Sequence, residues 1–303
     1  MRSMEALAPL LKELRLQGSI FSRAELRAPW GVETLGGDKA IFHVVLSGSA
    51  WLRPLGGAPV ELGQGDLAVL MRGQPHILGD RRDGPAIPIG AFESGPGADG
   101  LPCLRNAATG AETSILCGTL SFDPEARAFI QRQLPPVLHT PSDQTAPWLD
   151  TSLQMLAAEV DAPAGDAIVG RLAEVLFIQV LRKLATAETP PRWLKALQDP
   201  GIGRALALIH GEPREAWTSR TLAASAGMSR SVFYERFQSL VGESPSAYVT
   251  RWRMTLACGA LRHSDQGMYE VATAVGYASE AAFSKAFKRE VGVPPSVWRQ
   301  AVA

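Results

Sequence analysis

The chain has 303 residues, of which 46% are hydrophobic and 20% are charged, and this length allows two domains with a core each. Its apolar runs fall short of the ~18 residues that a membrane-spanning helix needs, and its three cysteines are too few for a disulfide framework. Composition therefore excludes membrane-embedded and disulfide-rich classes and favours a reducing, cytoplasmic setting. The acidic residues near the start also argue against a signal peptide.

The 30 basic and 30 acidic residues cancel, which argues against nucleic-acid binding by the chain as a whole. The two charges are unevenly distributed, however. Residues 200–303 contain 12 Lys and Arg against 8 Asp and Glu, a net charge of +4, so residues 1–199 have a net charge of −4. The C-terminal third is therefore the part whose charge suits a phosphate backbone.

Residues 4–16 are predicted to form a short amphipathic helix, because its leucines fall on one side. From about residue 18 to residue 122, short apolar or alternating runs are broken by Gly and Pro, which is typical of an antiparallel sandwich or barrel. The predicted strands are residues 40–45, 50–55, 60–62, 67–71, 87–92 and 114–120, and residues 95–100 are predicted to be a loop.

Two stretches of this region resemble the motifs of cupin barrels. The run from Gly65 to His76 is similar to the second cupin motif, and Gly37 followed by His43 is similar to the first. The second histidine of the family's metal site would fall on Val45, and the family's glutamate is missing. The resemblance implies a cupin-like sensor barrel over residues 1–140. The alternative to a sensor is a cupin-type metalloenzyme with a DNA-binding appendage.

In a cupin barrel the strands that carry His43, His76 and Cys117 would turn these side chains towards one interior. Two imidazoles and a thiolate can hold Zn²⁺ or a similar divalent metal. Alternatively, the histidines are hydrogen-bonded core residues and the cysteine is a small apolar side chain. A third possibility is that Cys103 and Cys117 form a redox pair that senses an oxidant.

Two further helices are predicted at residues 148–160 and 167–185. The stretch from Val175 to Leu181 is apolar nearly all round, which suits burial within the domain or pairing with a second subunit. We assign residues 141–186 to a helical dimerisation segment. The proline-rich residues 187–200 are predicted to be the linker to a C-terminal domain over residues 201–303.

Residues 217–298 contain one pattern twice. Each copy has an alanine, then a glycine, a serine, two phenylalanines four residues apart, and a Gly-x-x-Pro sequence; its residues are Ala223, Gly227, Ser229, Phe233, Phe237, Gly242 and Pro245 in the first copy and Ala272, Gly276, Ser279, Phe283, Phe287, Gly292 and Pro295 in the second. Glycine suits the left-handed turn after a helix, and serine suits the N-cap of the next. The pattern therefore predicts two helix-turn-helix motifs.

These repeats resemble the DNA-binding domain of AraC/XylS-type transcription regulators, and the resemblance covers about the last hundred residues. Between the repeats, residues 246–261 are predicted to form one helix of roughly 24 Å at ~1.5 Å per residue. Such a rod can hold two recognition helices in successive major grooves. One protomer is thus expected to read two groove segments.

Residues on the faces opposite the phenylalanines are expected to contact DNA. The expected outward-facing residues are Arg230, Ser231, Tyr234, Glu235 and Gln238 in the first copy and Glu280, Ala281, Ser284, Lys285 and Lys288 in the second. The resemblance assigns base reading to Ser231, Tyr234, Glu235, Glu280, Ala281 and Lys285. Ser229, Ser279, Arg251 and Arg253 are expected to contact phosphates.

Taken together, these features predict an α+β protein: a cupin-like antiparallel β-barrel with dimerisation helices, followed by an all-α domain with two helix-turn-helix motifs. The resemblance implies a cytoplasmic, homodimeric transcription regulator, more often an activator. Its expected partners are double-stranded promoter DNA, RNA polymerase and an effector, which is a small molecule, a metal or an oxidant.

Overall fold

The computed structural model describes residues 11, 15–97, 101–142, 151–152, 155 and 165–302. The helix predicted at residues 4–16 and the one predicted at 148–160 lie almost wholly outside the described residues. The chain divides into two compact units. The β unit consists of residues 16–122 and 135–183, and the helical unit consists of residues 1–15, 123–134 and 184–303.

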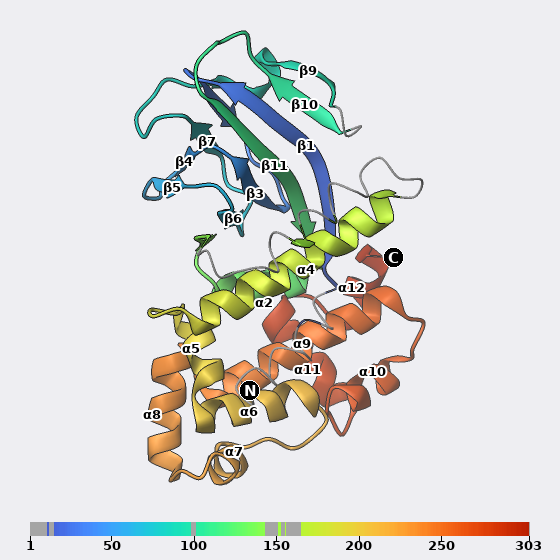
Figure 1. Ribbon diagram of the computed structural model, residues 1–303. Helices are drawn as coiled ribbons and strands as arrows, with labels where there is room; N and C mark the ends of the chain where they lie inside the picture. Colours follow the sequence, from blue (N-terminus) through green and yellow to red (C-terminus); the bar gives the residue numbers. More distant parts are fainter. Residues whose placement is uncertain are drawn as a thin grey trace. The chain divides into compact units, whose positions relative to one another are not determined.

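The β unit contains two sheets rather than one closed barrel, and both can be followed in Figure 1. The larger sheet has the strand order β12-β6-β3-β11-β1-β10-β9, with bounds β1 Gln17–Arg27, β3 Ala40–Ser47, β6 Leu67–Leu70, β9 Glu93–Pro96, β10 Pro102–Arg105, β11 Glu112–Ser121 and β12 Val137–Thr140. The smaller sheet has the order β5-β4-β7-β2-β8, with bounds β2 Gly31–Thr34, β4 Ala50–Pro54, β5 Val60–Leu62, β7 His76–Gly79 and β8 Ile87–Pro88.

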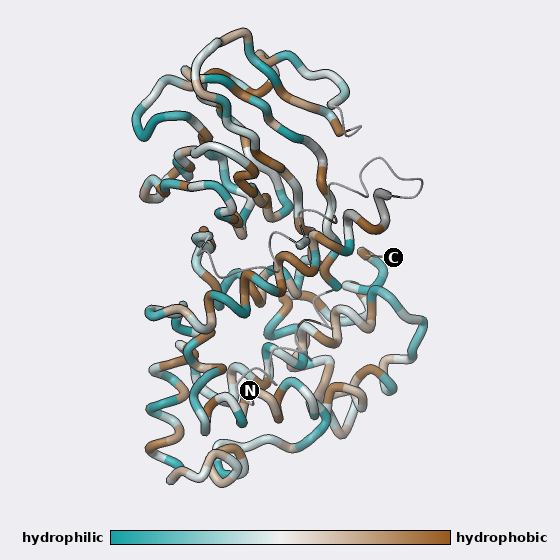
Figure 2. Tube along the Cα trace, in the orientation of Figure 1, coloured by the Kyte–Doolittle hydropathy of each residue, from teal (hydrophilic) through white to brown (hydrophobic). Residues whose placement is uncertain are grey.

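Most strand pairs are antiparallel, and alternate side chains of both sheets form a shared apolar core. Leu26, Val45, Leu52, Leu70 and Ile115 are almost completely buried in it. Figure 2 shows apolar residues recurring along β1 and β11, as expected for strands with one face in the core. The predicted β-rich fold is confirmed, although closure of the barrel is not.

Strands β1, β2, β7, β10 and β12 were not among the predicted strands, and two local assignments in this unit were wrong. Residues 87–92, predicted as one strand, form the two-residue strand β8 and a 3₁₀ turn, η2 (Ile89–Ala91). Residues 95 and 96, predicted as part of a loop, end strand β9, which pairs with β10. Pro88 explains the first difference, because it cannot donate to a ladder and so limits a strand to an edge position.

Helix α2 (Pro124–Gln133) interrupts the strands between β11 and β12, and it belongs to the helical unit. No helix was predicted here, because prolines flank the segment on both sides. Pro124 occupies the first helical position, where a missing amide donor costs nothing, and Ala126, Phe129 and Ile130 form a buried stripe. The predicted boundary at residue 140 therefore does not coincide with the division into compact units.

Helix α4 (Gly165–Thr186) matches the helix predicted at 167–185. Leu176, Phe177, Val180 and Leu181 are buried within the chain, and the Phe177 ring lies 5.7 Å from that of Phe122. Intramolecular packing therefore accounts for most of this apolar run.

The predicted linker at residues 187–200 contains helix α5 (Arg192–Gln198). Trp193, Leu194 and Leu197 are buried, so this segment is part of the helical core. Its prolines precede or begin helices: Pro191 is the N-cap of α5, and Pro200 is the first residue of α6 (Pro200–Gly211). They suggested a linker because proline marks both helix starts and loose connections.

The two helix-turn-helix motifs follow the predicted register. The first consists of α7 (Ser219–Ser225) and α8 (Arg230–Val241), and the second of α10 (Met268–Ala274) and α11 (Glu280–Val291). Helix α9 (Pro245–His263) joins them, and α12 (Pro295–Val302) ends the described chain. None of the helices in the described ranges is long and apolar enough to cross a membrane.

Candidate functional site

The two turns have the backbone geometry that their sequence predicts. Gly227 and Gly276 adopt positive φ values of 68° and 83°, a region that favours glycine. Directly after the turns, Ser229 Oγ accepts a hydrogen bond from the Val232 amide, and Ser279 Oγ accepts one from the Ala282 amide. Both serines are therefore N-caps, which fixes where α8 and α11 begin.

The paired phenylalanines set the rotation of each recognition helix. Phe233, Phe237, Phe283 and Phe287 are completely buried, and the ring centroids within the pairs are 5.6 and 5.5 Å apart. Since residues at i and i+4 share one helix face, burying them turns the opposite face outward.

The structure places the predicted DNA-contacting residues of both helices at the surface, with one exception. Ser284 is only partly exposed, and the exposed residues are Ser229, Arg230, Ser231, Tyr234, Glu235, Gln238, Ser279, Glu280, Ala281, Lys285 and Lys288. Val232, which was not among the residues expected to face outward, is 52% exposed. An exposed apolar residue in the first turn of α8 is a further candidate for base contact, and only the helix's actual rotation identifies it.

Arg251, predicted to contact a phosphate, is paired with a carboxylate of the protein itself. Its guanidinium makes a two-point ion pair with Glu243, in which Nη1 lies 2.8 Å from Oε1 and Nη2 donates to Oε2. Burial raises the pKa of Glu243, and Arg251 acts against that shift. Arg251 therefore stabilises the start of α9.

Arg253 is also structural. It donates to three main-chain carbonyls: from Nε to Pro213 at 2.9 Å, from Nη2 to Glu215 at 2.6 Å, and from Nη1 to Gly276 at 3.3 Å. Its guanidinium also lies 5.7 Å from the centre of the Tyr277 ring. Arg253 thus ties α9 both to the loop before α7 and to the second turn. Sequence spacing could not reveal carbonyls that come from loops 23 to 40 residues away.

The β unit contains a cavity of about 400 Å³. Many of the side chains that line it from the strands are aliphatic, and they include Leu26, Val32, Ile41, Leu78, Leu104 and Ile115. Its polar side chains include His43, His76 and Cys117 and the hydroxyls of Ser22, Thr34 and Thr119. Among the described residues at its wall, the ionised side chains are Asp38 and Lys39, and both are exposed. The buried part of the cavity is therefore uncharged.

His43, His76 and Cys117 form a chain of hydrogen bonds, and the described contacts fix its direction. The Gln74 carbonyl can only accept, so His76 Nδ1, 3.0 Å away, must donate to it. Neutral His76 then accepts at Nε2 from His43 Nε2, at 2.9 Å. His43 Nδ1 is left to accept from the Cys117 thiol, 3.2 Å from Sγ. Every member of the chain is satisfied without a bound metal.

A family model for cupin domains matches residues 5–186, and one for a helix-turn-helix domain matches residues 222–301. The chain is 31% identical over 304 residues to the HTH-type transcriptional regulator AlkR of Acinetobacter baylyi, covering 98% of this chain and 99% of AlkR. It is also 31% identical over 306 residues to a putative AraC-like transcription regulator of Streptomyces lividans, covering 98% of each. The chain belongs to the AraC family of transcriptional regulators.

Among solved structures, the DNA-binding domain of AdpA in complex with a target DNA is similar to this AraC-family regulator. That domain is 33% identical, with a TM-score of 0.32, and the match covers 34% of this chain and 92% of the AdpA domain.

The three polar residues in the cavity of this AraC-family protein are not arranged as a chelate. The two nitrogens of His43 point at different partners, Cys117 on one side and His76 on the other, so one ion cannot bind all three donors. Within the described part of the chain no group of three or more His, Cys, Asp or Glu side chains could hold a metal ion. The geometry supports the second prediction, hydrogen-bonded core histidines.

The redox pair predicted for this AraC-family protein is wrong. Cys103 lies on β10 and Cys117 on β11, and β1 runs between these two strands, pairing Arg23 with Cys103 and Ser22 with Cys117. Two strand spacings place the backbones roughly 10 Å apart, beyond the ~7 Å that a disulfide can bridge. Burial also raises the pKa of the Cys117 thiol to about 12, which removes the reactive thiolate.

Acid is expected to destabilise the β unit of this AraC-family regulator. Burial lowers the pKa of His43 well below its ordinary value of 6.5, and His76 lowers it further. Below pH 6.5 the unfolded chain therefore binds a proton that the folded chain excludes, so stability present at neutral pH is lost as the pH falls. The loss is up to about 1.4 kcal/mol per pH unit for each such histidine. Scanning calorimetry between pH 7.5 and 5.5 should show it. If the His43→Gln variant lost stability equally steeply with falling pH, groups other than His43 would be the cause.

Proposed function

We propose that this AraC-family regulator reads promoter DNA through the exposed faces of α8 and α11. The observation that carries the proposal is the equivalence of the two helices: each begins at a serine cap and buries two phenylalanines. Each also exposes the side chains opposite, at either end of α9. Glu235 and Glu280 can accept from cytosine, Ala281 can contact a thymine methyl, and Lys285 can donate to guanine.

The second part of the proposal is that the cavity binds an uncharged, largely apolar effector. Its buried wall offers aliphatic side chains and two histidines that burial keeps neutral. A ligand's charge buried there would have no counter-ion, and an unpaired buried charge is strongly unfavourable. The volume of about 400 Å³ is within the usual range for small-molecule sites.

Three probes with one ten-carbon chain test this part: 1-decanol, decanoate and decylammonium. Calorimetric titration should show 1-decanol binding at least about tenfold more tightly than either ion, because 1.4 kcal/mol of desolvation already gives that factor. Ile41→Asp, which places a carboxylate at the cavity wall, should abolish binding of 1-decanol. Leu55→Asp is the matched control, since Leu55 is 74% exposed and does not line the cavity. Equal binding of the alcohol and the ions would refute the assignment.

The remaining parts concern assembly. We propose that the regulator acts in the cytoplasm as a homodimer that activates transcription with RNA polymerase, without enzymatic activity. Ile168 and Val175, seven residues apart on α4, are 42% and 41% exposed and supply an apolar surface for a second subunit. Dimerisation would double the number of groove segments that the protein protects on DNA.

A further inference from the structure

Helix α2 follows β11 closely in the chain. That strand ends at Ser121, α2 begins at Pro124, and β12 begins at Val137, so short connections flank the helix on both sides. Cys117 and Thr119, which line the cavity, are within seven residues of Pro124. The segment 123–134 nevertheless belongs to the same compact unit as the helix-turn-helix motifs.

The C-terminal half of α2 packs on the start of α9. Phe129 is 1% exposed, and its ring centroid lies 5.6 Å from Tyr248 and 5.3 Å from Trp252. Tyr248 in turn lies 5.7 Å from Phe237, one of the two phenylalanines that anchor α8. Phe129 is therefore part of the aromatic cluster that holds the first recognition helix against α9.

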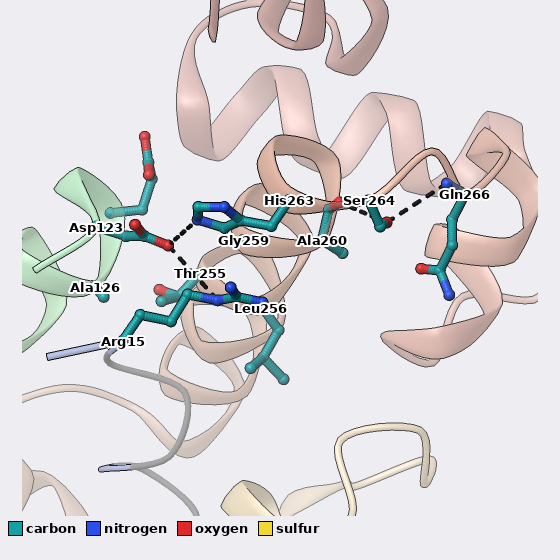
Figure 3. A pocket seen from close by; sticks show the side chains of 11 residues that line it. Arg15, Asp123, Ala126, Thr255, Leu256, Gly259, Ala260, His263, Ser264 and Gln266 are labelled. Carbon is teal, nitrogen blue, oxygen red and sulfur yellow. Dashed lines mark hydrogen bonds and ion pairs between the residues drawn. The ribbon is translucent and has the colours of Figure 1, made fainter. Parts of the chain in front are cut away.

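The N-terminal half of α2 is paired with the end of α9. Arg262 Nη2 donates to both carboxylate oxygens of Glu125, at 3.2 and 3.3 Å, and His263 Nε2 lies 2.7 Å from Oδ2 of Asp123. Figure 3 shows the His263 ring pointing at the Asp123 carboxylate, and both residues line a cavity of about 230 Å³. Arg262 also lies 5.0 Å from the Trp298 ring, which contacts Phe287 of α11 at 6.1 Å.

The residues of α9 that α2 contacts thus run from 248 to 263, a length of about 22 Å at ~1.5 Å per residue. At one end Tyr248 also packs on Phe237 of α8, and at the other Arg262 packs on Trp298, which contacts Phe287 of α11. From this geometry we propose that α2, docked along α9, holds the two helix-turn-helix motifs in one relative arrangement; we call this role a splint. A ligand that displaces β11 then changes DNA affinity through α2, and this part rests on the proposed effector cavity. Such coupling requires that the ligand bind the two arrangements with different affinity.

Charge reversal across the Glu125–Arg262 pair tests the splint in the full-length protein. In the unaltered chain, saturating 1-decanol should change the Kd for a selected DNA site by about 5- to 150-fold, the usual range for coupled sites. Glu125→Arg and Arg262→Glu should each reduce that factor to about 1 without abolishing the binding of 1-decanol. The double variant, with the pair reversed, should restore it. Arg81→Glu breaks an exposed ion pair with Asp80 in the β unit, away from β11, and should leave the factor unchanged.

A second readout does not depend on any ligand. Spin labels at Ser239→Cys on α8 and Ala282→Cys on α11, both exposed positions, report the distance between the motifs. Glu125→Arg should broaden the distance distribution, and the reversed pair should narrow it again. An unchanged distribution in Glu125→Arg overturns the splint. Failure of 1-decanol to bind the unaltered protein, with the broadening still present, counts instead against the proposed effector class.

Discussion

Replacing Lys285 with alanine is expected to weaken binding to the preferred DNA site by about 1 to 3 kcal/mol, or roughly 5- to 150-fold in Kd. Lys285 is exposed on α11, on the face opposite two completely buried phenylalanines. A lysine that reaches a base edge can donate to guanine, and alanine leaves those acceptors without a donor. Fluorescence anisotropy with the preferred duplex and with a scrambled duplex measures the effect.

The ratio of the two affinities distinguishes base reading from backbone contact. If Lys285 reads a base, the loss is confined to the preferred duplex, and if it contacts a phosphate, both duplexes lose equally. Lys195→Ala is the matched control, because Lys195 is an exposed cation on α5 outside the recognition helices. It should change neither affinity appreciably. A Lys285→Ala variant that retains full affinity for the preferred duplex would remove α11 from the reading surface.

Replacing Arg253 with alanine is expected to destabilise the helical unit by about 2 to 4 kcal/mol. The substitution leaves the carbonyls of Pro213, Glu215 and Gly276 without their donor and removes the cation from the Tyr277 ring. Because these contacts orient the second turn, DNA affinity should fall on every sequence alike. Urea unfolding gives the stability change, and anisotropy on two unrelated duplexes gives the affinity change.

Two further variants serve as comparisons for Arg253→Ala. Arg253→Lys keeps the charge but cannot span three separate carbonyls, so its loss of stability should be intermediate. Arg220→Ala removes an exposed cation from α7 and should leave stability within about 0.5 kcal/mol. If Arg253→Ala unfolded at the same urea concentration as the unaltered protein, yet lost DNA affinity, the original phosphate assignment would be restored.

Features set by neighbouring residues could be predicted from the sequence. The glycines of the two turns, the serine caps and the phenylalanine pairs act over spans of about ten residues, and a repeated pattern defines them even without a structure. The strands from residue 40 to residue 71 were likewise visible as apolar runs between turns.

Features set by distant contacts could not be predicted from the sequence. Phe129 of α2 meets its aromatic partners about 120 residues further along the chain, and proline-rich flanks concealed the helix. Prolines also concealed α5, although Trp193 and Leu197 mark its buried face. The acceptors of Arg253 are main-chain carbonyls, which every residue has, so no side-chain pattern identifies them.

The central claim is that one protomer places two recognition helices in successive major grooves. Hydroxyl-radical footprinting on a site obtained by selection from random duplexes tests it most directly, using the unaltered protein and a Glu280→Ala, Lys285→Ala double variant. The unaltered protein should protect segments spaced by about 10 to 10.5 base pairs on one face of the duplex. The variant should lose the protection that α11 provides while keeping that of α8. Protection of a single segment per protomer, equally weakened throughout by the double substitution, would contradict it.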